Sequence, residues 1–183
     1  IEHPDTATSY NSIGLAYSYL GEYDKGLEYI YKALAIREKN LGIEHPDTAM
    51  SYFAIGEVCF LLRDYTKALD YHKESLSIRE KTLGLEHIDT SISYENVGRI
   101  KYQLSDYGGA LNYYSKALCI RENVLGLQHP LLVSIYSNIG SVYYAIGEYS
   151  KALEFDREAL KGCRITYGNK HVKTALFNEY LGN

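Results

Sequence analysis

The sequence predicts an all-α solenoid of paired helices, and three observations carry this prediction. A histidine returns every 42 residues and opens a related block each time, at His3, His45, His87, His129 and His171. Each block contains two stretches with signals for the start and the end of a helix. The 183 residues include only three prolines, which suits helices. Because no insertion disturbs the period, we expect the units to stack on one another.

The repeat divides the chain into four full units and the start of a fifth. The full units are 3–44, 45–86, 87–128 and 129–170, and the partial one is 171–183. We expect a single array over residues 1–183. Since Ile1 is not an initiator methionine, we also expect the array to be a fragment of a longer protein.

The first helix of each unit follows the histidine, which we number position 1 of its unit. Aspartate at position 3 and threonine at position 4 predict a helix start capped by the aspartate side chain, at Asp5, Asp47 and Asp89. Leu131 holds this position in the fourth unit, so its cap is expected to be weaker. The helix should cover positions 4–17, which are residues 6–19, 48–61, 90–103 and 132–145.

The second helix follows a turn that usually contains glycine, as in "LGEYD" and "IGEYS". It should cover positions 22–38, which are residues 24–40, 66–82, 108–124 and 150–166. A Leu-Gly pair then ends it in the first three units, at Gly42, Gly84 and Gly126. Each unit is therefore expected to be an antiparallel pair of helices.

Positions that repeat faithfully predict the packed surfaces. Position 8 is tyrosine in each full unit, position 11 is Ile or Val, and position 12 is glycine. A glycine inside a helix lowers helix stability by about 1 kcal/mol relative to alanine, so its return predicts close contact with the small residue at position 24. The aromatic residue at position 21 should wedge between units. The Arg-Glu pairs of the "IRE" segments are expected to be solvated charges.

This pattern resembles the tetratricopeptide repeat. The match includes the glycine at position 12, Gly-x-Tyr around positions 19–21, a small-Leu pair at 24–25 and Ala-Leu at 31–32. The 42-residue period and the "LG-x-x-HPD-T-A" connector resemble the variant in kinesin light chain and nephrocystin-like proteins. The resemblance implies a right-handed superhelix. Its concave face, lined by the first helices, would hold a peptide.

Positions 9, 13 and 16 of the first helix form a stripe turned away from the packed positions, and their chemistry changes from unit to unit. Eleven of these residues and two that border the stripe, Tyr19 and Met50, form the candidate groove: Asn11, Leu15, Tyr19, Met50, Phe53, Glu57, Phe60, Glu95, Arg99, Tyr102, Ser137, Ser141 and Tyr144. We expect Phe53 and Phe60 to form an apolar pocket and Arg99 to bind a ligand carboxylate. Tyr19, Tyr102 and Tyr144 would be amphipathic contacts. Alternatively, some of these aromatic residues pack against neighbouring first helices.

Two ligand classes of the family can be compared with these residues. The family's clamp for chaperone C-termini uses a set of lysines and asparagines at first-helix positions that hold Asn11, Leu15, Ala54, Ile92 and Asn96 in this chain. The lysines are absent, which makes that ligand improbable. The tryptophan-acidic peptides of kinesin light chain favour a basic groove, whereas this stripe has Arg99 against Glu57 and Glu95. The identity of the partner therefore stays open.

Other function classes find little support. The net charge of −4 argues against nucleic-acid binding, and no run reaches the roughly 18–20 apolar residues of a membrane span. Three cysteines without a CxxC pair argue against disulfides or zinc and favour the cytoplasm. Histidines about 10 Å apart could not share a metal that needs ligands at about 2 Å. We expect no cofactor.

No catalytic motif is present, so we expect a non-catalytic module that binds a protein or peptide. The alternative is self-association through exposed terminal repeats, for which Leu176 and Leu181 are the test residues. We also make predictions for three single residues. Cys59 is expected to be a small core residue and His72 a half-buried one, while Lys101 is expected to extend to solvent or to pair with an acid.

Overall fold

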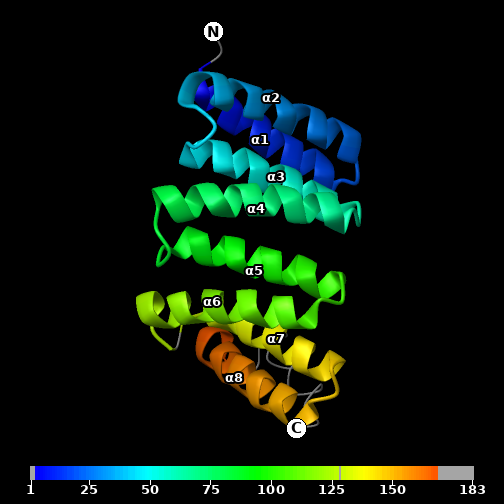
Figure 1. Cartoon of the computed structure of the whole chain (residues 1–183), viewed down its shortest axis with the longest axis vertical. Coiled ribbons are helices and arrows are strands. Elements are labelled where there is room, and N and C mark those ends of the chain that lie inside the picture. Colours follow the sequence, from blue (N-terminus) through cyan, green and yellow to red (C-terminus); the bar gives the residue numbers. More distant parts are fainter. Residues whose placement is uncertain (1–2, 128, 169–183) are drawn as a thin grey trace. The chain divides into compact units, whose positions relative to one another are not determined.

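The computed structural model describes residues 3–127 and 129–168, and within them every regular element is an α-helix (Figure 1). Their bounds agree with the predicted ranges to within one or two residues. The helices are α1 Pro4–Tyr19, α2 Tyr23–Leu41, α3 Pro46–Leu61, α4 Tyr65–Thr82, α5 Ile88–Gln103, α6 Tyr107–Leu125, α7 Leu131–Ala145 and α8 Tyr149–Tyr167. The partial repeat 171–183, including Leu176 and Leu181, lies outside the described residues.

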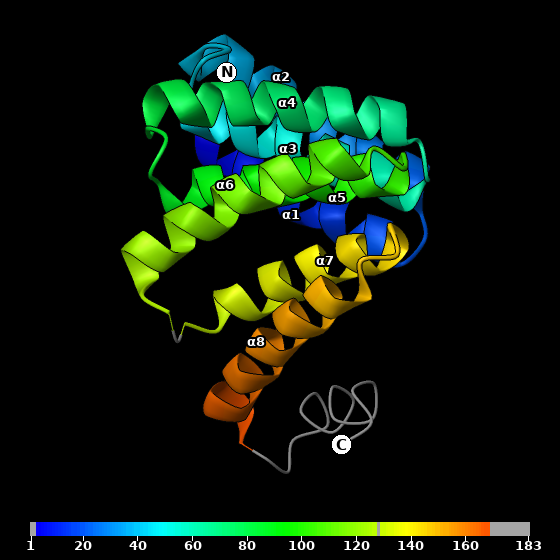
Figure 2. The ribbon, with the colours of Figure 1, turned by 60° about the horizontal axis from the view of Figure 1, so that its bottom comes forward.

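The chain forms two compact units, residues 1–100 and residues 101–183. In the first unit α1 pairs with α2 and α3 with α4, and α2 also packs against α3. In the second unit α7 pairs with α8, and α6 packs against α7 (Figures 1 and 2). The paired helices confirm the predicted helix hairpins. The boundary between the units falls inside α5, so it does not coincide with the boundary of a repeat.

The first helices are capped by the repeating histidine and not by aspartate, so that part of the prediction was wrong. The Nδ1 atom of His45 accepts a hydrogen bond from the Asp47 backbone N–H at 3.1 Å, and His3 and His87 make the same bond. The aspartate lies in the first turn, where its charge favours the helix dipole. His129 also accepts from the Leu131 N–H, at 3.2 Å, so leucine at position 3 leaves this contact intact.

The predicted glycine contact lies toward the turn of the first hairpin, where Gly26 is in the first turn of α2. A Cβ on Gly14 would lie 2.7 Å from the carbonyl oxygen of Gly26, which is the residue at position 24. The two helices therefore approach more closely than any larger side chain allows. A core cluster of the first unit is formed by Ile30, Leu34, Ala54, Ile55, Val58, Cys59, Ala68 and Ile100. Cys59 is a small core residue, as predicted.

Two of the aromatic residues at position 21, Tyr23 and Tyr65, pack against the core cluster shared by the first three repeats, which agrees with the predicted wedge between units. In the second, third and fourth repeats the ring at position 21 also contacts the aromatic residue at position 16, on the other side of the same turn. The ring centroids are 5.5 Å apart for Phe60 and Tyr65, 5.6 Å for Tyr102 and Tyr107, and 5.3 Å for Tyr144 and Tyr149. The tight turn brings positions 16 and 21 together, and each pair fixes the end of a hairpin.

Candidate peptide-binding surface

The candidate groove residues of the first unit differ in how far they reach solvent. Tyr19 and Met50 are open, with 73% and 44% of their surface exposed. Asn11 and Leu15, in contrast, are covered. Asn11 is 7% exposed and its Oδ1 has no hydrogen-bond partner, while Leu15 packs against the core. The open candidates of the first unit are therefore Tyr19 at the end of α1 and Met50 on α3.

The centre of this surface is an ion pair between consecutive repeats. Arg99 on α5 donates from Nη2 to Glu57 Oε1 on α3 at 2.5 Å. Both residues occupy position 13 of their repeats. The Arg99 side chain is 34% exposed, whereas that of Glu57 is 18% exposed. The ion pair is thus partly shielded from water. Arg99 is bonded to Glu57, and part of its side chain still faces solvent.

A buried histidine lies on the inner side of this pair. His72 on α4 is fully buried, and its Nε2 lies 3.2 Å from Glu57 Oε1 without the alignment of a full hydrogen bond. Burial alone would raise the pKa of Glu57, but the His72 ring and the Arg99 charge outweigh it and hold this pKa below its usual value. Glu57 is therefore ionised at neutral pH. His72 is more deeply buried than predicted because its ring packs onto Gly56.

The two phenylalanines of the predicted pocket have separate partners. Phe53 meets the edge of the His72 ring at 5.1 Å between centroids, and the Arg79 guanidinium lies 5.1 Å from its ring. Phe60 packs on Tyr65, and the Arg99 guanidinium lies 4.1 Å from the Phe60 ring. Both rings are half-buried. The surface thus presents aromatic rings partly covered by arginines, with Met50 as its most open apolar residue.

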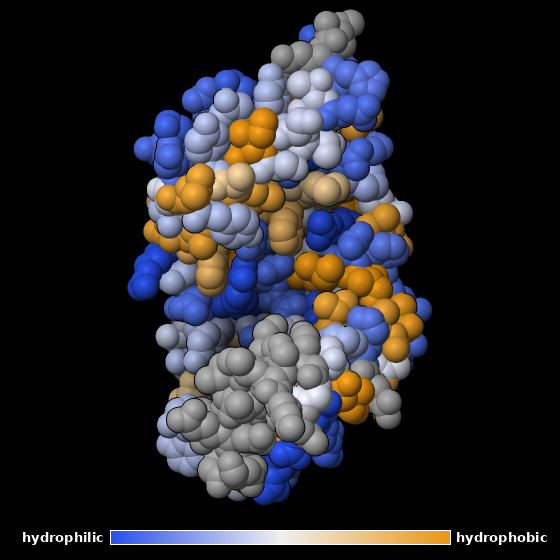
Figure 3. All heavy atoms as spheres, turned by 180° about the vertical axis from the view of Figure 1, so that it is seen from behind, coloured by the Kyte–Doolittle hydropathy of each residue, from blue (hydrophilic) through white to orange (hydrophobic). Residues whose placement is uncertain are grey.

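Figure 3 shows the side of the molecule that is turned away in Figure 1, where apolar side chains lie next to strongly hydrophilic ones. Glu95, the remaining candidate of the first unit, is half-buried on α5. In the second unit Tyr102 is half-buried and Tyr144 exposed, and both pack on the tyrosine after the turn. Ser137 is half-buried and Ser141 is exposed. The candidates thus form one set in each unit.

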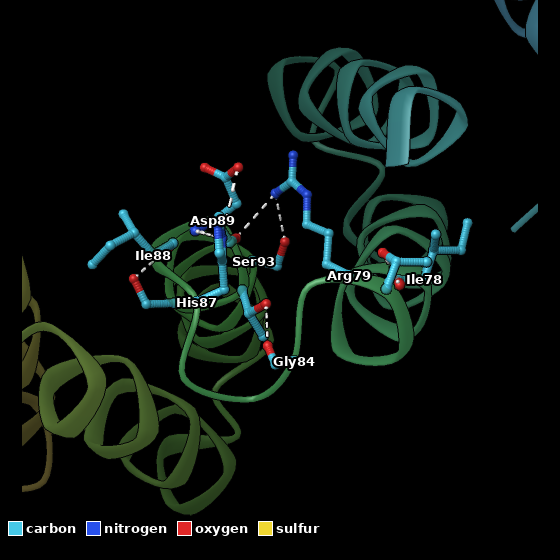
Figure 4. A network of polar contacts seen from close by, with 10 residues as sticks. Ile78, Arg79, Gly84, His87, Ile88, Asp89 and Ser93 are labelled. Atoms are coloured by element: carbon cyan, nitrogen blue, oxygen red, sulfur yellow. Dashed lines mark hydrogen bonds and ion pairs between the residues drawn. The ribbon is translucent and has the colours of Figure 1, made fainter. Parts of the chain in front are cut away.

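The Arg-Glu pairs were predicted as solvated charges, and this was wrong. Arg79 is buried and donates to Ser93 Oγ at 2.7 Å and to the Asp89 carbonyl at 3.2 Å (Figure 4). Its neighbour Glu80 accepts a hydrogen bond from the Tyr94 hydroxyl at 2.5 Å. Both contacts join the second helix of one repeat to the first helix of the next. The pair therefore connects repeats.

The same connection recurs along the chain. Arg37 donates to Ser51 Oγ at 2.8 Å, and Tyr52 donates to Glu38 at 2.8 Å. In the second unit Arg121 donates to the Leu131 carbonyl at 2.9 Å, and Tyr136 donates to Glu122 at 2.8 Å. The sequence signal for these contacts was the tyrosine at position 8, which recurs 14 residues after the glutamate.

Lys101 forms an ion pair with Asp106 at 2.7 Å, one of the two expected alternatives. Across residues 3–127 and 129–168, no three His, Cys, Asp or Glu side chains gather where they could hold a metal. None of the described helices combines the length and the apolar character needed to cross a membrane.

Solved structures with the same arrangement of helices include a putative kinesin light chain from Podosopora anserina with nearly identical TPR-like repeats. A single-residue variant of that protein gives a TM-score of 0.85 at 20% identity, covering 99% of this chain and 85% of that one. BtubC (BKLC) from P. vanneervenii gives 0.81 at 26% identity, covering 93% and 68%. Aspartyl phosphate phosphatase F from Bacillus subtilis gives 0.81 at 19% identity, covering 99% and 45%.

In sequence, no curated protein is significantly similar to the chain. A family model described as tetratricopeptide repeat matches residues 5–81, 55–123 and 89–165. These overlapping matches extend over most of the chain and follow the helix pairs of the structure. The solved structures agree with this match and share the kinesin light chain-like form of the repeat. The chain belongs to the tetratricopeptide repeat family.

Proposed function

We propose that this chain is a cytoplasmic, non-catalytic module that binds a partner polypeptide on the first-helix surface of residues 1–100. Repeats of this family are typically scaffolds for protein–protein interaction. The proposed surface consists of Met50, Phe53, Glu57, Phe60 and Arg99. It would bind an extended or short helical segment with an apolar side chain for the rings and a carboxylate for Arg99.

The observation that carries this proposal is the contrast between position 13 and the packed positions. Position 12 is glycine in every full repeat because a neighbouring helix touches it, whereas position 13 is Leu15, Glu57, Arg99 and Ser141. The Glu57–Arg99 pair stays partly open to solvent and lies beside the Phe60 ring. A surface that is free to vary and combines charge with apolar area is suited to recognise one particular partner.

The test is a selection of random peptides displayed on phage against the whole chain. Enriched peptides are then rebound to Met50→Asp and Arg99→Gln, which alter the most open apolar residue and the cation. The matched control is Lys73→Glu, because Lys73 is exposed on the second helix α4. Each variant must first melt cooperatively at a temperature close to that of the wild type.

We expect the enriched peptides to lose at least about tenfold in affinity for the first two variants and to keep their affinity for Lys73→Glu. Peptides that bind all four proteins equally would place the ligand on another surface and contradict the proposal. The enriched peptides would also give a motif with which to search for the natural partner. The prediction of one continuous array over residues 1–183 stays a proposal, and the peptide site needs only the first unit.

A further inference from the structure

Glu57 joins a cation that faces solvent to a titratable ring inside the protein. Its Oε1 atom lies 2.5 Å from Arg99 Nη2 and 3.2 Å from His72 Nε2. The Arg99 side chain is 34% exposed, whereas that of His72 is fully buried. A ligand can therefore reach Arg99 but not His72, and Glu57 is the group through which the one affects the other.

This contact between an acid and a histidine is not required by the common packing of the repeats. Glu57 occupies position 13 of the second repeat, and His72 occupies position 28. The same two positions hold Leu15 and Ile30 in the first repeat, Arg99 and Tyr114 in the third, and Ser141 and Asp156 in the fourth. Because isoleucine fills position 28 in the first hairpin, close packing alone does not explain a histidine there.

The polar atoms around Glu57 are not all paired. Among the described residues, neither ring nitrogen of His72 has a hydrogen-bond partner, and Arg99 has none at Nε. Buried polar atoms without a partner are uncommon in folded proteins and point to a functional role or to a group that binds there. The site thus has unused capacity on both sides of Glu57, for a second acceptor at Arg99 and for a proton at His72.

Three helices bring the charged groups that determine the protonation of this site. Glu57 lies on α3, and α5 contributes Arg99 and, one turn before it, the half-buried Glu95. From α4 come His72 and the Arg79 guanidinium, which lies 5.1 Å from the phenylalanine ring that His72 contacts. Burial raises the pKa of Glu57, while His72 and Arg99 lower it. A second carboxylate at Arg99 would weaken the effect of Arg99, and the pKa of Glu57 would then rise.

The other two helices of the first unit add no charge at this point. The charged residues that α2 brings to α3 are Arg37 and Glu38, and they bond Ser51 and Tyr52, nearer the start of α3. The stripe of α1 is uncharged, with Asn11, Leu15 and Ser18 at the three positions. No further cation from α1 or α2 therefore replaces Arg99 beside Glu57.

We propose that a ligand carboxylate binds at Arg99 together with one proton, which the Glu57–His72 pair takes up. The two carboxylates share one guanidinium and repel each other, and a proton held between Glu57 Oε1 and His72 Nε2 removes this repulsion. The proton comes from the solvent and balances the negative charge of the ligand. The proposal rests on the proposed function, and it adds that binding of an acidic partner is stronger at lower pH.

The probe is a phage-enriched peptide that contains an acidic residue and loses affinity for Arg99→Gln. Titration calorimetry in phosphate and in Tris at pH 7 gives the number of protons taken up. We expect about 0.5 proton or more per peptide, and an affinity that falls about threefold or more from pH 6 to pH 8. Binding that needs Arg99 but takes up no proton overturns this proposal alone. Enriched peptides that do not need Arg99 contradict the proposed function, and this proposal with it.

Variants of the pair locate the proton. Glu57→Gln keeps the shape of the side chain and frees Arg99, so it should bind the peptide about threefold more tightly or better at pH 8, without proton uptake. His72→Gln should take up less than half as much, because glutamine cannot bind a proton. The control is Glu44→Gln, the acid of an exposed ion pair with Lys81, which should leave the uptake unchanged. Equal uptake by the wild type and either variant of the pair overturns the proposal.

A second measurement needs no ligand and decides the proposal even if His72→Gln fails to fold. Arg99→Gln removes the cation from Glu57, and carbon-13 NMR of the glutamate carboxyl groups follows the titration, with the Glu57 signal assigned from its loss in Glu57→Gln. We expect Arg99→Gln to raise the pKa of Glu57 by at least about one, and Lys81→Gln to leave it unchanged. An unchanged pKa of Glu57 in Arg99→Gln overturns the proposal.

Discussion

Arg99 on α5 donates a hydrogen bond to Glu57 on α3, and the two residues occupy the same position of consecutive repeats, 42 residues apart. Equivalent positions of adjacent repeats are neighbours in a stacked array, so opposite charges there link the two helices. The link lies within the proposed binding surface. A ligand carboxylate that reaches Arg99 must therefore share it with Glu57, and recognition and repeat packing depend on the same side chain.

The strength of this link is measurable in a double-mutant cycle of Glu57→Gln and Arg99→Gln. We expect a coupling free energy of about 1 kcal/mol, because the pair is only partly exposed. Urea unfolding of the four proteins gives this value. The matched control is Lys81 and Glu44, an ion pair with both side chains more than half exposed. A coupling at Glu57 and Arg99 that is no larger than the control would show that the pair adds little.

Glu57 also predicts how stability changes with pH. Its pKa is lower in the folded chain than its usual value of 4.5. An acid whose pKa is lowered by folding stabilises the folded state at pH values above its usual pKa. This stability is lost as the pH falls through the lower pKa of the folded state. The wild type should therefore lose more stability than Glu57→Gln between pH 6 and pH 3. Parallel stability profiles of the two proteins would contradict this assignment.

The glycine contact predicts opposite effects for two similar substitutions. Gly14→Ala should destabilise the chain by about 2 kcal/mol or more, because the new Cβ would lie 2.5 Å from Ile30 Cγ1 and 2.7 Å from a carbonyl oxygen. Gly108→Ala should stabilise it by about 0.5–1 kcal/mol, because no atom lies within 4 Å and alanine favours a helix. Thermal unfolding distinguishes the two. A gain in stability from Gly14→Ala would contradict the close approach of α1 and α2.

We predict that the charged side chain of Arg79 contributes as much to the free energy of unfolding as a core residue does. Arg79→Ala should destabilise the chain by about 2–4 kcal/mol, because it leaves a void and removes the partner of Ser93. Arg157 is exposed on α8 and serves as the control, with an expected change below about 0.5 kcal/mol. Urea unfolding measures both. Equal small effects would show that Arg79 is solvated after all.

Asp156 is expected to lower stability at neutral pH. It is 5% exposed, and burial raises its pKa above the usual value of 3.8. An acid whose pKa is raised by folding destabilises the folded state at pH values above its usual pKa, because the acid ionises more readily in the unfolded chain. Asp156→Asn should therefore add about 1 kcal/mol at pH 7 and have little effect at pH 3. A loss of stability at pH 7 would indicate a favourable role for the charge.

The period of the sequence was sufficient to predict the helices and the contact of Gly14 with Gly26. A periodic sequence shows each packing rule several times, so local signals can be compared between repeats. The cap was harder to assign. Histidine and aspartate recur together, and both side chains can accept a hydrogen bond from a helix N-terminus. Only the geometry shows that the His45 ring reaches the Asp47 N–H.

The candidate site was less predictable because its contacts cross between helices. Arg79 looked like an ordinary charge near a helix end, and its partner Ser93 lies in the next repeat. The stripe on the first helix included Glu57 and Arg99, but it did not show that they bind each other. It also included Asn11, which is covered in the structure. Helical spacing gives the direction of a side chain, and burial depends on which neighbours fill the space above it.

The most direct test of the proposed binding surface uses the only methionine of the chain, Met50, which is the most open apolar residue of that surface and is 44% exposed. With ¹³C-methyl-methionine labelling, this residue gives a single NMR signal. Titration with a peptide enriched in the phage selection should move that signal in a saturable way, with the same affinity that calorimetry measures. An unmoved Met50 signal during calorimetrically verified binding would contradict a ligand site on the first helices of residues 1–100.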